Sequence, residues 1–255
     1  YWISAPLDKK SLLSSQGPSM KPRNIVAQSQ AYSRLTLDLI EHDGRHFLEC
    51  EGRQVDAQHL GRPAHDLVQM ICQPFRAAKQ PRILFLGLGF GHGVAAARHY
   101  LPQEKADFVI FPEAKELPDW LQEHLEESPL DDERVHIETL SPFNPIPEKY
   151  SGSQAVVMDM DLLEGLSPSG YKPVHPVSLG NIHQMLKAGG FLGLIGTRLN
   201  PSLKKALQRG GFEVVHEFAP LSDKSKKNRT LYLARKGNYS EIVKHPNFNE
   251  THFLR

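Results

Sequence analysis

The chain has 255 residues, of which 40% are hydrophobic and 23% charged, and 30 Lys and Arg oppose 29 Asp and Glu for a formal net charge of +1. This composition excludes a chain that is disordered throughout, and it speaks against a nucleic-acid partner bound through a basic surface. Cys50 and Cys72 are too few for a disulfide framework. We therefore expect a globular protein of roughly one to two domains in a reducing cytoplasm.

The first 30 residues carry no hydrophobic period. They are rich in Ser, Gln, Pro and Lys, and they lack the basic start and apolar core of a secretory signal. We expect an extended arm there that either lies on a partner surface or is loosely ordered. No apolar run of the chain reaches the roughly 18 to 20 residues of a membrane helix, so we expect no membrane contact.

A β-hairpin and a helix are predicted next. Apolar residues alternate in SRLTLDLIE, Asp43-Gly44 is a turn signal, and RHFLECEGR forms the returning strand. From Arg62 to Phe75 the apolar residues recur at helical spacing, with Pro63 in the first turn. This helix should lead into the core of the protein.

From residue 82 onward, short apolar runs alternate with longer amphipathic segments. The predicted strands are RILFL, DFVIF, RVHIETL, AVVMDM, FLGLIG, FEVVHEFA and TLYLARK. The predicted helices between them are GVAAARHYL, PDWLQEHLEE, VSLGNIHQMLKAGG and PSLKKALQRGG. This alternation predicts an α/β fold with a mostly parallel sheet covered on both faces. Only a loop joins the last two strands, so these should be antiparallel neighbours.

A glycine-rich turn joins the first core strand to the following helix. Gly87, Gly89 and Gly91 form a GxGxG pattern directly after RILFL. Glycines let the backbone approach a ligand closely, and a helix start offers free N–H groups and a positive dipole end. The dinucleotide fingerprint would need glycine at His92, and no GxxxxGK[ST] phosphate loop is present. The alternative is a turn that only packs the strand against the helix.

The GxGxG turn, the KAGGFLGL segment and the final pair RGGFEVVHEF and TLYLARK resemble class I S-adenosylmethionine-dependent methyltransferases. The resemblance covers most of residues 80–236 and implies a Rossmann-like sheet with an antiparallel last strand. Within that superfamily, EGRQ and PAHDLVQM are similar to spermidine synthases, which have a DG-x-x-Q hairpin end and a YHE-type segment there. The resemblance implies that Gln54, His65 and Asp66 line the cofactor and amine pocket, with Ala64 in place of the tyrosine.

The resemblance also implies where an adenosyl group would bind. The family has an acidic residue at the end of the second core strand that binds the ribose hydroxyls. Here that strand ends in Phe111-Pro112, and the nearest acid, Glu113, either reaches the ribose or is solvated at a helix start. The family also has an aspartate that contacts the adenine amino group, and Ser141 stands near that position.

The fourth core strand ends in Met158-Asp159-Met160-Asp161, where spermidine synthases have a D-x-x-D-P segment. In the family, these carboxylates bind the amine substrate and help to deprotonate the attacking nitrogen. The candidate catalytic residues are Asp159 together with Asp161 or Asp66, which would hold a nucleophile and partly deprotonate it. In the alternative interpretation, Asp159 is one acid at a topological switch point and Asp161 an ordinary loop residue.

Other chemical motifs have little support. The 13 His show no HExxH or C-x-x-C arrangement, so we predict no metal site. No GxSxG elbow of a hydrolase is present. The run KSKKNR at residues 224–229 is interpreted as a solvated loop.

We divide the chain into an N-terminal arm and hairpin region (1–61), a methyltransferase-like domain (62–238) and a C-terminal tail (239–255). The hairpin region is a candidate lid or dimerisation element, so a homodimer through it is one arrangement that we consider. The first functional hypothesis is methyl transfer from S-adenosylmethionine to a small-molecule acceptor. The second is aminopropyl transfer from decarboxylated S-adenosylmethionine, as in polyamine synthases. The third, motivated by Phe111 and Ser141, is a non-catalytic relative that has lost cofactor binding.

Overall fold

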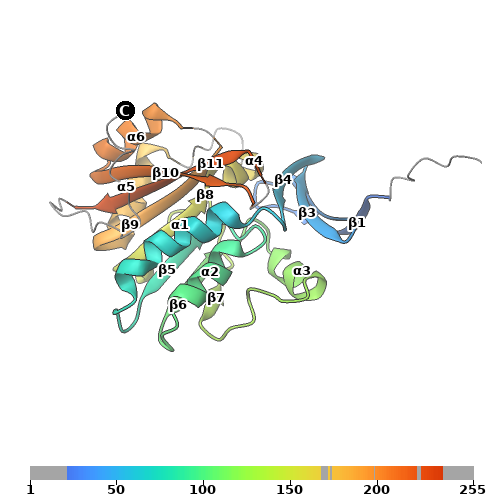
Figure 1. The fold of residues 1–255 in the computed structure, drawn as a ribbon, viewed down its shortest axis with the longest axis horizontal. Coiled ribbons are helices and arrows are strands. Elements are labelled where there is room, and N and C mark those ends of the chain that lie inside the picture. Colours follow the sequence, from blue (N-terminus) through green and yellow to red (C-terminus); the bar gives the residue numbers. More distant parts are fainter. Residues whose placement is uncertain (1–21, 168–171, 173, 198, 223–224, 238–255) are drawn as a thin grey trace, which may run out of the picture.

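The computed structural model describes residues 22–167, 172, 174–197, 199–222 and 225–237. These residues form a four-stranded and a seven-stranded β-sheet with their helices (Figure 1). Most of the expected N-terminal arm and the C-terminal tail lie outside the described residues. Within the described part of the chain, no helix is both long enough and apolar enough to cross a lipid bilayer.

The four-stranded sheet is antiparallel and has the order β1-β2-β3-β4. Its strands are β1 (Asn24–Gln30), β2 (Thr36–His42), β3 (Arg45–Cys50) and β4 (Arg53–Ala57). The predicted hairpin is β2 and β3, and its turn residues Asp43 and Gly44 have φ of 52° and 71°, as a type I′ turn requires. The prediction of an arm up to residue 30 was wrong for β1, whose mostly exposed side chains give no apolar alternation.

The seven-stranded sheet has the order β10-β11-β9-β8-β5-β6-β7. Its strands are β5 (Arg82–Leu86), β6 (Asp107–Phe111), β7 (Val135–Ile137), β8 (Ser153–Asp159), β9 (Leu186–Gly196), β10 (Phe212–Pro220) and β11 (Asn228–Lys236). Strand β11 is antiparallel to both of its neighbours, and the remaining pairs are parallel. The predicted Rossmann-like sheet with an antiparallel last strand is confirmed.

The helices follow the predicted alternation with two corrections. They are α1 (Arg62–Cys72), α2 (His92–Tyr100), α3 (Leu117–His124), α4 (Met160–Leu166), α5 (Pro176–Met185) and α6 (Pro201–Arg209), with 3₁₀ turns at Gln73–Phe75 and Glu148–Tyr150. The segment LKAGG begins β9 instead of ending a helix, because Gly189 takes a φ of 73° that a helix does not allow. Helix α4 was not predicted, because its 7 residues are too few to show a period.

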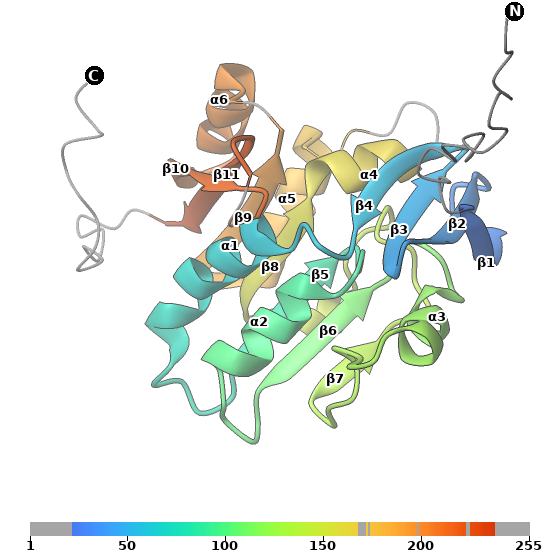
Figure 2. The ribbon, with the colours of Figure 1, turned by 45° about the vertical axis from the view of Figure 1, so that its right-hand side comes forward.

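Alternating residues of the core strands face two separate hydrophobic cores. On β5, Ile83 and Phe85 join the core under α1, α2 and α3, whereas Leu84 and Leu86 join the core under α5 and α6. Figure 2 shows α1 and α2 side by side in front of the sheet. Burial on both faces explains why the central strands are continuous apolar runs.

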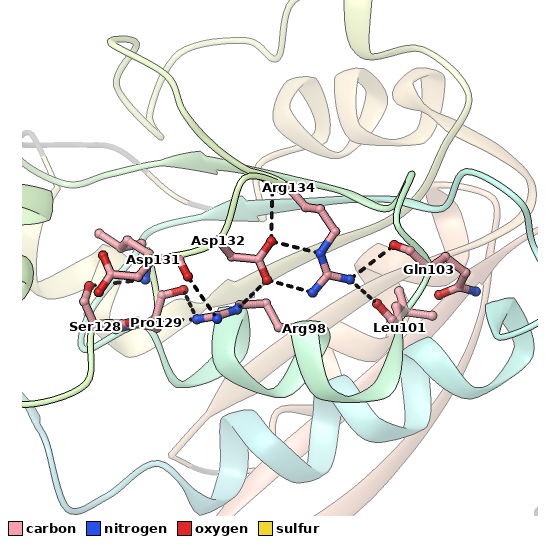
Figure 3. Close-up of polar contacts among 9 residues, drawn as sticks. Arg98, Leu101, Gln103, Ser128, Pro129, Asp131, Asp132 and Arg134 are labelled. Atoms are coloured by element: carbon pink, nitrogen blue, oxygen red, sulfur yellow. Dashed lines mark hydrogen bonds and ion pairs between the residues drawn. The ribbon is translucent and has the colours of Figure 1, made fainter.

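An ion network fixes the loop between α3 and β7 (Figure 3). Asp132 accepts hydrogen bonds from Arg98 Nε at 2.8 Å and from Arg134 Nη2 at 2.7 Å. These guanidinium groups, Arg134 above all, hold the pKa of Asp132 well below its usual range. Arg98 also donates to the Pro129 carbonyl at 2.9 Å. The ring of Pro129 packs so closely on Gly91 that a side chain at Gly91 would overlap it. The network therefore supports the glycine-rich turn from outside.

Replacing Asp132 with alanine should lower the free energy of unfolding at pH 7 by about 2 kcal/mol, because both guanidinium groups lose a partly buried charged acceptor. Since folding lowers the pKa of Asp132, its contribution is present above about pH 4 and is lost as the pH falls further. Chemical denaturation at several pH values measures this. The exposed neighbour Asp131 is the control, and an equal loss in D131A would contradict the prediction.

Candidate functional site

A cavity of about 140 Å³ lies at the carboxyl ends of β5 and β8. The chain runs outward from β5 to β6 and β7 and then returns to β8 on the other side of β5. Such a switch point is where open α/β sheets bind ligands. Besides the glycine-rich turn, the polar residues that line the cavity are Gln54, Asp56, His92, Asp159 and Arg229.

The glycine-rich turn, which we call the glycine loop (residues 87–91), needs its glycines for conformational reasons. Gly87, Gly89 and Gly91 have φ of 96°, 52° and 74°, values that other residues rarely adopt. A side chain at Gly89 would also overlap the carboxylate of Asp56. The GxGxG pattern therefore corresponds to a backbone that approaches its surroundings closely.

Glu113 is fully buried behind the glycine loop. Its Oε2 accepts a hydrogen bond from the Leu88 amide at 2.8 Å, and its Oε1 accepts one from the Gly89 amide at 3.0 Å. Burial raises the pKa of Glu113, although the loop amides oppose this shift. The interpretation of Glu113 as a solvated residue was therefore wrong, because the residue lies two places past the strand end and turns inward. Its contact with a ribose stays a prediction.

Asp56, at the end of β4, brings a second carboxylate to the glycine loop. Its Oδ2 accepts a hydrogen bond from the Phe90 amide at 3.1 Å, and its Oδ1 accepts one from the Ala57 amide at 2.8 Å. Burial and then the charge of Asp159 raise the pKa of Asp56 to about 7. Asp56 was missed from the sequence because β4 was not predicted. As a strand, EGRQVDA would have placed Asp56 on the same face as Gln54.

Asp159 ends β8 and caps the N-terminus of α4. Its Oδ1 accepts hydrogen bonds from the Asp161 amide at 3.0 Å and the Leu162 amide at 3.2 Å. Arg229 donates to both oxygens of Asp159, from Nη1 and Nη2, at 2.7 Å each. Arg229 also forms an ion pair with Asp161, whose Oδ2 accepts a hydrogen bond from Thr197 Oγ1 at 2.6 Å. The two candidate acids therefore share one guanidinium partner.

The interpretation of KSKKNR as a solvated loop was wrong for its last residue, Arg229. The residue lies in β11, and its side chain is only 18% exposed. The sequence signal was ambiguous, because the charged run continues into the first residues of the strand. Only the pairing of β11 with β9 and β10 shows where the loop ends.

Three predicted residues lie away from the cavity. Asp66 accepts a hydrogen bond from Arg62 Nε at 2.8 Å, one turn away on α1. His65 and Asp66 line a second depression, beside α1. Ser141 is buried in the loop after β7, where its Oγ accepts a hydrogen bond from the Phe143 amide at 3.2 Å. The structure thus brings Gln54, the glycine loop and Asp159 together, but not these three. Among the described residues, no group of three or more His, Cys, Asp or Glu is placed to hold a metal ion.

No family model and no curated protein matches the chain. Solved structures do resemble it. A spermidine synthase in complex with the transition state analogue AdoDATO has a TM-score of 0.58 and 14% identity over 84% of this chain and 72% of that one. Spermidine synthase from Thermotoga maritima has a TM-score of 0.60 and 14% identity over 84% of this chain and 73% of that one. A probable spermidine synthase from Corynebacterium glutamicum has a TM-score of 0.55 and 14% identity over 85% of this chain and 82% of that one.

The TM-scores of these similarities lie above 0.5, so they concern the overall fold. They cover 84% to 85% of the chain. The chain therefore has the fold of the spermidine synthase structures.

Proposed function

We propose that the chain is a transferase that binds decarboxylated S-adenosylmethionine and transfers its aminopropyl group to a small-molecule acceptor. The observation that carries the proposal is the convergence of three carboxylates, from Asp56, Glu113 and Asp159, around the glycine loop. Burial, together with the charge of Asp159, raises the pKa of both Asp56 and Glu113. A cationic ligand would relieve this concentration of negative charge.

The occupied loop amides favour the decarboxylated cofactor over S-adenosylmethionine itself. The amides of Leu88, Gly89 and Phe90 already donate to Glu113 and Asp56. A ligand carboxylate at the loop would therefore lack these donors and would lie beside like charges. Decarboxylated S-adenosylmethionine has a sulfonium and an ammonium group but no carboxylate. The bound analogue AdoDATO in one of the similar spermidine synthase structures supports the same ligand class.

The size of the cavity requires side chains to move when the nucleoside binds. Its volume of about 140 Å³ is below the roughly 300–1,000 Å³ of small-molecule sites. For Glu113 to bind ribose hydroxyls, its carboxylate would have to leave the amides of Leu88 and Gly89. The small cavity and the engaged Glu113 carboxylate favour the alternative of a non-catalytic relative. Ligand binding is therefore the decisive measurement.

In the proposed reaction, the bond between the sulfonium sulfur and the propyl carbon breaks and the acceptor nucleophile bonds to that carbon. The products are methylthioadenosine, the aminopropylated acceptor and one proton. The sulfonium is already a good leaving group, so positioning of the two substrates supplies most of the acceleration. Asp56 is the carboxylate best suited to accept the proton, because its pKa is raised to about 7. Asp159 and Asp161, which hold Arg229 beside the cavity, would set the position of the acceptor.

Calorimetric titration of the purified chain should show decarboxylated S-adenosylmethionine binding at least about tenfold more tightly than S-adenosylmethionine, because only the latter places a carboxylate near the acidic residues. Methylthioadenosine, which has no charged side arm, is the reference ligand. Equal or tighter binding of S-adenosylmethionine would favour methyl transfer instead. Absence of binding by all three ligands would favour the non-catalytic alternative.

The affinity for decarboxylated S-adenosylmethionine should rise between about pH 6 and pH 8, because Asp56 loses its proton near pH 7 and the ionised form attracts a cation. Asp56→Asn should bind more weakly and remove this pH dependence. Asp119→Asn, at an exposed carboxylate on α3, is the matched control. A pH dependence that persists unchanged in D56N would assign it to another group.

A further inference from the structure

The structure assigns a role in acceptor choice to Arg229. We propose that its guanidinium group fills the position beside Asp159 and Asp161 that an ammonium group of a polyamine would need, so that the acceptor is an amine carrying a carboxylate. This inference rests on the proposed transferase function and specifies the acceptor class for the same cavity.

Three of the four carboxylate oxygens of the two acids beside Arg229 are already engaged. Asp159 Oδ1 accepts from the Asp161 and Leu162 amides and from Arg229, and Oδ2 accepts from Arg229. Asp161 Oδ2 accepts from Thr197 and from Arg229. An incoming ammonium group would therefore have to compete with a guanidinium group that binds both carboxylates.

That competition favours Arg229. An arginine side chain keeps its charge in proteins, and its planar fork matches a carboxylate better than an ammonium does. The contact with Asp159 is of this two-pronged kind, and the two side chains are only 18% and 23% exposed. A polyamine would also meet the positive charge of Arg229 itself, and like charges at close range oppose binding.

Arg229 has a donor left for an anionic group. Its Nε is buried and has no hydrogen-bond partner among the described residues, and the residue lines the cavity. A buried N–H of a guanidinium group is stabilised when an oxygen, best of all a charged one, accepts from it. A carboxylate on the acceptor would supply that oxygen, while its amine would face the aminopropyl group of the cofactor.

Putrescine and ornithine are a matched pair of probes, because ornithine is putrescine with a carboxylate on one terminal carbon. Both are titrated calorimetrically into the full chain saturated with methylthioadenosine. The wild type should bind ornithine at least about tenfold more tightly than putrescine. Arg229→Gln should reverse this preference, because the acids become available to the second ammonium group. Arg209→Gln, at an exposed arginine ending α6, should behave as the wild type.

Arg229→Lys separates charge from geometry. It keeps a positive charge without the planar fork, so it should still reject putrescine but lose affinity for ornithine. The proposal is overturned if the wild type prefers putrescine, or if R229Q binds methylthioadenosine normally and keeps the wild-type preference. If methylthioadenosine does not bind the wild type, the proposed function fails, whereas the putrescine and ornithine titrations of the free chain still test Arg229.

Discussion

The cavity at the carboxyl ends of β5 and β8 depends on the hydrogen bonds between buried carboxylates and the glycine loop. The loop leaves β5 with three glycines at positive φ, and its hydrogen bonds to Glu113 are buried. Glu113 from the end of β6 and Asp56 from β4 accept from three consecutive loop amides. Because a buried amide without a partner is costly, this arrangement also joins the four-stranded sheet to the core.

Charge is distributed unevenly around this loop. Burial raises the pKa of Asp56 and of Glu113, and the charge of Asp159 adds to both shifts. Arg229 offsets the charge of Asp159 and Asp161 on the β11 side of the cavity. One side of the cavity thus suits a cation, whereas the other already contains one. This asymmetry underlies our proposal of a cationic cofactor and of an acceptor amine that carries a carboxylate.

The surrounding structure holds the loop from two directions. On one side, the four-stranded sheet is anchored by the Tyr32 amide, which donates to the Glu113 carbonyl at 3.0 Å, and Figure 2 shows this sheet beyond the carboxyl ends of β5 and β6. On the other, the network of Arg98, Asp132 and Arg134 places Pro129 against Gly91. A loop with so many glycines needs such support, because glycine loses the most conformational freedom on folding.

Local patterns of the sequence predicted the sheet, the glycine loop and the position of Asp159, because apolar periodicity, turn residues and strand ends are local properties of the chain. It did not reveal β1, whose residues are exposed, nor α4, which is too short to show a period. The contacts of Asp56 with Phe90 and of Arg229 with Asp159 join residues 34 and 70 positions apart. These contacts can be seen only in the folded chain, because the neighbours of a charged side chain depend on which elements pack together, and burial then shifts its pKa.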